Sequence, residues 1–319
     1  MAVADQPRNK RGTVTLMGEV DIEKKENDQK QGTDAWWWPE GVIFRGKRTS
    51  DIPIYIKESR PQGLLSKYIQ CFWDMRWELG LEQTTCLVVP SGCVNVVYSL
   101  GRLPPGFLKA KIVGARTVSH PVEMTGSGIS FGFRFSPGGF YAFSKKDASS
   151  FTDKVFPLDE VFGEDAAEIE SIGLKDDSVE KKAANLKNIL ARHIPHTHDE
   201  DMLRLHKIMQ AISENEKIKN TAQLTSEFGI TERSLQRLFS RYVGVSPTMW
   251  IRTKRFQQAA KQVLAGNIHD WSRLATELGY YDQSHFINDF RSLTGRKPSE
   301  LVTEREILSD FSNTRNHIT

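Results

Sequence analysis

The chain has 319 residues, of which 39% are hydrophobic and 26% charged, which is ordinary for a globular protein with room for two domains. The formal net charge of +3 excludes a strongly basic chain, and no apolar run approaches the roughly eighteen residues of a membrane-spanning helix. The three cysteines Cys71, Cys86 and Cys93 form no C-x-x-C pair, which argues against a disulfide framework or a structural zinc site. The polar N-terminus shows no secretory signal, so we expect a soluble, cytoplasmic protein.

Residues 1–50 predict a largely disordered polar tail, because the stretch 22–34 is nearly all charged or polar. Such a composition buries too little apolar surface to offset the entropy of the chain. A Trp-rich patch interrupts the tail at Trp36-Trp37-Trp38-Pro39, and Val42, Ile43 and Phe44 follow it. We expect this patch to dock onto the neighbouring domain, with a partner-binding peptide as the alternative.

Residues 51–165 predict a β-rich domain, because short apolar segments alternate there with Pro, Gly and Ser turns. The expected strands are 54–56, 86–89, 94–98, 111–113 and 129–135. This spacing favours a small β-barrel or jelly-roll-like domain with a sensing or dimerising role. Pro90-Ser91-Gly92 predicts a hairpin turn, and Leu64 to Met75 has helical spacing. After Pro137 the chain is expected to turn into a helix.

A jelly roll can hold a metal centre, but the histidines argue against one here. Only His120 lies between residues 51 and 165, so three imidazole ligands cannot come from this domain. Arg134 could anchor an anionic ligand, although a surface or salt-bridged arginine is the preferred interpretation. The segment His196-Thr197-His198 could bind a metal, yet Pro195 favours an interhelix loop. We therefore expect no catalytic residue, no metal and no cofactor.

Residues 166–212 predict a helical linker with two apolar stripes at helical spacing. The first stripe is Ala183, Leu186, Ile189, Leu190 and Ile194, and the second is Met202, Leu205, Ile208, Met209 and Ile212. These helices are expected to join the two halves of the chain. One stripe could also pair with a second subunit.

Residues 213–305 contain an internal repeat. The segment 224–229, Leu-Thr-Ser-Glu-Phe-Gly, returns at 274–279 as Leu-Ala-Thr-Glu-Leu-Gly, and Phe239 and Pro247 then match Phe290 and Pro298. Each copy predicts a short helix, a glycine turn and a longer helix, which is the helix-turn-helix outline. Thr221 is the expected N-cap of the first helix in the first copy, and Gly229 is expected to end that helix. Thr231 with Glu232 is expected to start the next helix.

The outward faces of the two longer helices carry side chains suited to DNA. Apolar residues at 235, 238, 239 and 242 are expected to be buried, which leaves polar residues outward. Arg and Gln can bind guanine and adenine in two-point fashion, and Ser and Arg can bind phosphate. The predicted DNA-binding residues are Arg233, Ser234, Gln236, Arg237, Ser240 and Arg241 in the first copy and Gln283, Ser284, His285, Asn288 and Arg291 in the second. A solvated helix face is the alternative for either helix alone.

A connecting helix, expected from Thr248 to Ala265, would fix the distance between the two copies. Its basic residues Arg252, Lys254 and Arg255 are predicted phosphate contacts. Residues 216–305 carry fourteen Lys and Arg against nine Asp and Glu, a surplus of five where the whole chain carries +3. This uneven charge is typical of a nucleic-acid-binding module.

Residues 213–302 resemble the DNA-binding domain of AraC/XylS-type transcription regulators. The match rests on Leu224–Gly229, Ser234–Phe239, Gly244–Pro247, Leu278–Tyr280, Asp282–Phe286, Phe290–Arg291, Leu293–Gly295 and Lys297–Ser299. The resemblance implies that residues placed like Arg233, Gln236 and Arg237 enter one major groove, and those placed like Gln283, Ser284 and Asn288 the next. Where many members carry arginine in the second helix, this chain has Asn288, so the first half-site is expected to dominate affinity.

Residues 52–165 are similar to an N-terminal domain often found ahead of this module. The matching phrases are Cys71–Trp73, Pro90–Val97, Gly114–Arg116 and Phe133–Phe140. This resemblance implies a barrel-like sensing or dimerising domain and names no ligand.

The sequence thus predicts an α+β multidomain protein. It would combine the β-rich domain, the helical linker and an all-α domain of two helix-turn-helix units joined by a helix, with a tail at 306–319. We expect a sequence-specific DNA-binding transcription regulator, not an enzyme, that acts on RNA polymerase at a promoter. A small-molecule effector and a homodimer stay open, and no membrane partner is expected. The alternatives are a DNA-repair methyltransferase that uses the same helical module, and a protein-interaction module.

Overall fold

The computed structural model describes residues 42–45, 54–101, 108–175, 177–195, 199–214, 218, 220–265 and 270–303. The Trp36–Trp38 patch, the His196-Thr197-His198 segment and the tail at 306–319 lie outside these ranges. Within the expected N-terminal tail, Val42–Arg45 is a strand paired with residues 85–88, so this part of the predicted docking patch joins the neighbouring domain.

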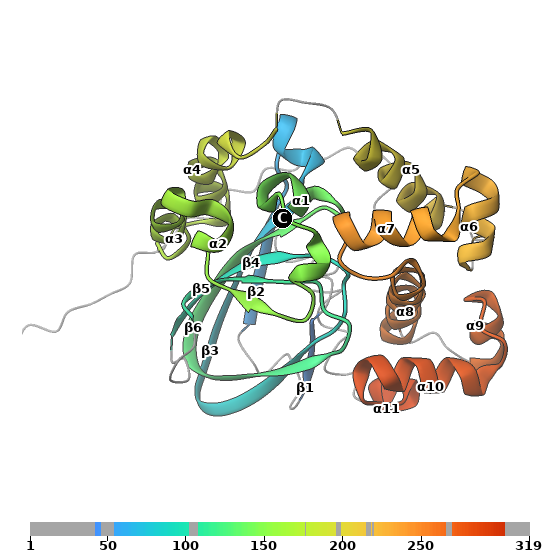
Figure 1. Ribbon diagram of the computed structural model, residues 1–319. Helices are drawn as coiled ribbons and strands as arrows, with labels where there is room; N and C mark the ends of the chain where they lie inside the picture. The colour runs from blue at the N-terminus through green and yellow to red at the C-terminus, as the bar shows by residue number, and fades with distance from the viewer. Residues whose placement is uncertain are drawn as a thin grey trace, which may run out of the picture.

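The N-terminal half is built on one antiparallel sheet of seven strands (Figure 1). Their order is β1-β3-β6-β4-β5-β7, with β2 also paired to β3. The strands are β1 Val42–Arg45, β2 Ile54–Ser59, β3 Ile69–Val88, β4 Asn95–Gly101, β5 Ala110–Val113, β6 His120–Phe135 and β7 Val155–Phe156. The sheet-rich domain is confirmed, although β3 and β6 are much longer than the segments that the alternating pattern predicted.

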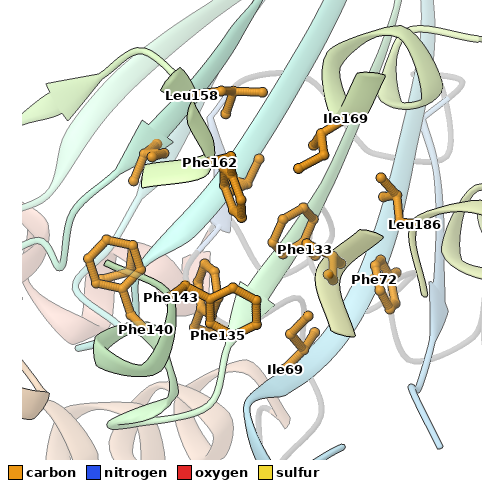
Figure 2. Close-up of a cluster of buried hydrophobic side chains, with 14 of the residues drawn as sticks. Ile69, Phe72, Phe133, Phe135, Phe140, Phe143, Leu158, Phe162, Ile169 and Leu186 are labelled. Atoms are coloured by element: carbon orange, nitrogen blue, oxygen red, sulfur yellow. The ribbon is translucent and has the colours of Figure 1, made fainter. Parts of the chain in front are cut away.

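One face of the sheet carries the core of this half. Phe131, Phe133 and Phe135 alternate along β6 toward this face and are at most 1% exposed. Figure 2 shows their neighbours, with rings from β3, α1 and α2 converging on Phe133 and Phe135. The covering helices are α1 Gly139–Ser144, α2 Asp159–Phe162, α3 Ala166–Gly173 and α4 Val179–Arg192. Four helices therefore close this face against water.

The opposite face of β6 is also covered, which the sequence did not predict. Two glycines make this packing possible, because a Cβ at Gly128 or Gly132 would lie 2.2 Å and 2.4 Å from the rings of Trp77 and Trp73. Arg134 is 7% exposed, and its Nε donates to the side-chain oxygen of Asn95 at 3.2 Å. Of the two expected settings for Arg134, surface or salt-bridged, the surface one is wrong, because the side chain is buried.

Two local predictions in this half are wrong. The helix expected over Leu64–Met75 is a short 3-10 helix, Gly63–Lys67, followed directly by β3. Pairing of Phe72 with Phe133 on the neighbouring strand outweighs the helical spacing of the apolar residues. Pro90-Ser91-Gly92 is no hairpin turn, because it links β3 to β4 and β6 lies between those strands.

The C-terminal half is all helical in the described residues. It contains α5 Glu200–Glu214, α6 Thr221–Phe228, α7 Glu232–Tyr242, α8 Pro247–Ala265, α9 Trp271–Glu277, α10 Gln283–Thr294 and α11 Pro298–Thr303. Helix α7 starts where it was expected, at Glu232, and Thr231 caps it, since its side chain accepts from the backbone N–H of Ser234. Asn220, not Thr221, caps α6, because its side chain and that of Gln223 form a reciprocal capping box. Gly229 ends α6 with a φ of 56°.

The expected linker divides between the two halves. Leu186, Ile189 and Leu190 of α4 are buried against the sheet, whereas Leu205, Ile208 and Met209 of α5 are buried among the helices that follow. Both apolar stripes are therefore buried within this chain, and the idea that one of them pairs with a second subunit is wrong. Among the described helices, none has the length and apolar character needed to cross a membrane.

A buried ion pair ties α4 to the sheet. Lys182 of α4 is 1% exposed, and its Nζ lies 3.6 Å from Oδ1 of Asp74 on β3 and 4.6 Å from the centre of the Phe131 ring. Asp74 also accepts from Nε of Arg76 at 2.8 Å. A buried cation of this kind needs its carboxylate partner.

We predict that Asp74→Leu lowers the free energy of unfolding by about 3–5 kcal/mol, because it leaves the Lys182 ammonium buried without a carboxylate. The double variant Asp74→Leu/Lys182→Met should recover most of that loss, since neither charge is then buried. Urea unfolding followed by circular dichroism measures both. Equal losses in the single and double variants would contradict the prediction.

Candidate nucleic-acid interface

Helix α7 owes its orientation to one apolar stripe. Leu235, Leu238, Phe239 and Tyr242 recur at helical spacing and are between 0% and 7% exposed. They pack against α5 and against Trp250 and Ile251 of α8. Because this stripe faces inward, the polar side of α7 faces outward. The sequence prediction for this helix is confirmed at the level of burial.

The polar side of α7 is only partly open. Arg233, Gln236 and Arg237 are exposed, and the Gln236 amide donates to the Glu232 carboxylate at 3.4 Å. Ser234 is half-buried, and its hydroxyl accepts from the capping hydroxyl of Thr231 at 2.9 Å. Three of the six predicted residues therefore present long polar side chains to solvent near the N-terminal end of the helix.

Ser240 and Arg241 instead contact the N-terminal half. The hydroxyl of Ser240 donates to that of Ser149 at 3.0 Å, and Nε of Arg241 lies 3.6 Å from Oδ1 of Asp147. The Arg241 guanidinium also sits over the Tyr141 ring, 5.8 Å from its centre. Ser240 and Arg241, which are predicted DNA-binding residues, therefore also contact the N-terminal half in this structure.

Helix α10 presents its predicted residues more openly. Gln283, Ser284, His285, Asn288 and Arg291 are all exposed, while Phe286 and Phe290 are 0% exposed. Asp282 caps this helix by accepting from the backbone N–H of His285. The side chains of one helix face thus lie together at the surface, as the repeat predicted.

Asp289 is the exception on α10, because it holds the second unit together. Its carboxylate accepts from the Tyr280 hydroxyl at 3.0 Å and pairs with Arg252 of α8. Burial, and then the nearby Asp289 carboxylate, raise the pKa of Tyr280 well above its usual range. Tyr280 therefore stays protonated as a hydrogen-bond donor.

The three predicted phosphate contacts of α8, Arg252, Lys254 and Arg255, are engaged in packing within the helical half. Arg252 donates to Ser292 as well as pairing with Asp289. Nζ of Lys254 lies 4.9 Å from the Trp250 ring centre, and the Arg255 guanidinium lies 4.8 Å from that of Tyr280. These three predicted phosphate contacts are half-buried, so each would reach DNA only with part of its side chain.

Helix α8 links the two units into one body. Trp250 and Ile251 belong to the cluster that buries α7, whereas Phe256, Ala259 and Val263 belong to the cluster that buries α10. The Phe256 and Phe290 rings lie 5.1 Å apart. Because one continuous helix contributes to both clusters, the separation of α7 and α10 is fixed by packing.

Three loops of the N-terminal half meet this helical body. A Cβ at Gly92 would lie 2.4 Å from the Trp250 ring, and one at Gly138 would lie 2.9 Å from Leu205. Ala115 is 0% exposed in the same cluster as α5 and α7. These residues belong to the segments 90–97, 114–116 and 133–140, which carried the sequence resemblance of the N-terminal part. Those segments thus form a docking surface.

Hydrogen bonds reinforce the docking surface. The Thr152 hydroxyl donates to the Gly244 carbonyl at 2.6 Å, and the Ser119 hydroxyl donates to the Leu293 carbonyl. The Tyr141 and Tyr242 rings lie 4.7 Å apart. Sequence reasoning missed this surface, although its glycines were visible as turn residues.

The cysteines are packing residues. Cys71, Cys86 and Cys93 are all buried and carry no disulfide. Burial raises the pKa of the Cys86 thiol to about 12, so its nucleophilic thiolate is disfavoured at neutral pH. No group of three His, Cys, Asp or Glu side chains within the described ranges has an arrangement that could hold a metal ion.

Two family models match the chain. Residues 57–157 match a domain of unknown function, DUF6597, and residues 224–304 match a helix-turn-helix domain. A transcriptional activator of the XylDLEGF operon from Pseudomonas putida, activator 1, is 25% identical over 104 residues. That match covers 32% of this chain and 31% of the relative. Activator 3 is 23% identical over 129 residues, 39% of each chain. The chain thus spans between about a third and two fifths of these curated relatives.

Solved structures give further likenesses. A probable AraC family regulator from Rhodopseudomonas palustris is 27% identical, with a TM-score of 0.29, over 32% of this chain and 97% of that one. ToxT from Vibrio cholerae, bound to (E)-4-(8-methylnaphthalen-1-yl)but-3-enoic acid, is 12% identical, with a TM-score of 0.36, over 83% of this chain and 100% of that one.

Residues 224–304 therefore match a class of DNA-binding domains, the helix-turn-helix domains. Within that class they are similar to the AraC/XylS type, and an antiparallel-sheet domain precedes them in this chain.

We predict that Gly92→Ala weakens the docking surface. Both Gly92 and Gly126 have positive φ, 69° and 60°, so alanine at either costs about 1–2 kcal/mol in the backbone. Only at Gly92 does the added Cβ meet Trp250, which should cost about 1–3 kcal/mol more. The two free energies of unfolding, compared by urea denaturation, measure the difference. Equal losses would mean that the Trp250 contact contributes nothing.

Proposed function

We propose that this chain is a sequence-specific DNA-binding transcription regulator that reads two successive major grooves. The observation that carries the proposal is the pair of exposed polar faces on α7 and α10, held on one helical body by α8. A recognition helix lies in the major groove and contacts base edges with its N-terminal residues. Exposed polar side chains near the N-terminal ends of both helices suit that role.

Helices α7 and α10 contribute unequally to DNA affinity. On α7, Arg233, Gln236 and Arg237 read the first groove, and Arg241 adds positive charge once it is released from Asp147. On α10, Gln283, Ser284 and Asn288 read the second groove, with Arg291 as its exposed cation. Because phosphate attraction depends on cations, the first half-site supplies more of the affinity.

The N-terminal half modulates this binding. It contacts α7 at Ser240 and Arg241, so any ligand or partner that shifts the docking surface acts directly on a recognition helix. Bound at a promoter, the protein recruits or blocks RNA polymerase. A small-molecule effector or a second copy of the chain would act through the sheet domain.

We predict that Gln236→Ala and Arg237→Ala each cost about 1–3 kcal/mol of binding free energy on a selected site and relax one base position. The binding site is first selected from a random duplex library at moderate salt, and fluorescence anisotropy then gives each Kd. Lys187→Ala, an exposed change on α4, serves as the control. A uniform loss across all sequences would place both residues on phosphate and contradict base reading.

The selected site should contain two half-sites whose centres lie about 10–10.5 base pairs apart. Scrambling the half-site of α7 should lower affinity more than scrambling that of α10, because α7 carries more cations. An insertion of about five base pairs turns the second half-site to the other side of the duplex and should cost as much as scrambling it. A selected motif with a single half-site would contradict two-groove reading, and no selected motif at all would favour a protein-interaction module.

A further inference from the structure

A hollow that is partly open to solvent lies between α5 and α7. Its α7 wall is one stripe of the helix, Ser234, Arg237, Leu238, Arg241 and Tyr242, and Ile230 precedes it. Its α5 wall is Asp201 and Arg204. Figure 1 shows α5 running beside α7. Three arginines and one aspartate therefore surround a single concave surface along the flank of a recognition helix.

Of the three arginines around the hollow, Arg204 lies outside the helix-turn-helix match. It precedes residues 224–304 and lies on α5, a helix that the sequence analysis assigned to a linker. Its side chain is exposed, and its Nη2 donates to the Phe228 carbonyl at 3.4 Å. That carbonyl lies in the last turn of α6, where a cation is favoured. The contact anchors the guanidinium beside the hollow and leaves its other N–H groups available for an anion.

The geometry of a groove-bound helix indicates which anion this is. An α-helix with its side chains is about 10–12 Å across, and the major groove is about 12 Å wide. A helix that fills the groove has a phosphate strand along each flank. Because α5 lies along one flank of α7, its exposed cations face that strand. Among the lining residues three arginines stand against one aspartate, Asp201, and Arg241 is also paired with Asp147 at the end of the hollow.

We propose, on the basis of the proposed function, that Arg204 binds a DNA backbone phosphate in this hollow. Arg237 forms the wall on the groove side and keeps its contact to the bases. Arg241, whose guanidinium lies over the Tyr141 ring and beside Asp147, closes the end nearest the N-terminal half. Helix α5 is therefore part of the DNA interface as well as of the core that supports it.

The test uses the full-length protein, the selected duplex and a scrambled duplex of the same length. Arg204→Gln removes the charge and keeps a donor for the Phe228 carbonyl. It should weaken both duplexes by the same factor and reduce the slope of log K against log salt by about 1. Arg204→Lys should keep the wild-type slope, because the charge remains. Lys187→Gln removes one exposed positive charge on α4 and should leave the slope unchanged.

An unchanged salt slope in Arg204→Gln, or a loss confined to the selected duplex, would overturn the phosphate assignment. Urea unfolding of each variant distinguishes a lost phosphate contact from misfolding. A destabilised Arg204→Lys variant with weak binding would indicate a structural role for Arg204. Failure of the proposed function gives a different result, namely that the wild-type protein binds neither duplex.

Discussion

The burial of one apolar stripe on α7 determines how this protein can meet DNA. Leu235 and Phe239 are 0% exposed, and they fix the rotation of the helix about its own axis. That rotation sends Arg233, Gln236 and Arg237 outward and places the flank of the helix against α5. It also presents the C-terminal end of the helix to the N-terminal half. A different rotation would remove the reading face, the hollow and the docking contact together.

The second unit uses the same scaffold with a different balance of charge. Phe286 and Phe290 take the places of the buried residues in the first unit, but Asp289 is an internal anchor for Tyr280 and Arg252. The loss of positive charge on α10 is thus partly a consequence of how the unit is held to α8. Shared burial on α8 makes the two units one body, so under the proposed function the second helix constrains where the first one binds.

The sheet domain meets this body through loops, through helix α1 and through the end of β3. Small residues at Gly92, Ala115 and Gly138 let the two halves approach closely, and side chains of the helical half fill the space beside them. Because the contact includes Ser240 and Arg241, the N-terminal half occupies the C-terminal end of α7. The segments that resembled a separate N-terminal family are therefore also the segments that join it to the DNA-binding half.

The sequence by itself determined the two helix-turn-helix units, the end of α6 at Gly229, the start of α7 after Thr231, and the outward polar residues of α7 and α10. These features follow from local periodicity and capping, which depend on residues only a few positions apart. Tertiary structure decided the length of β3, the crossover at Pro90–Gly92, the burial of Arg134 and the division of the predicted linker. It also decided which partners Arg252, Lys254 and Arg255 contact and that Arg204 lies beside α7. Each of these depends on a partner distant in sequence, and local patterns carry no information about which distant partner a side chain will meet.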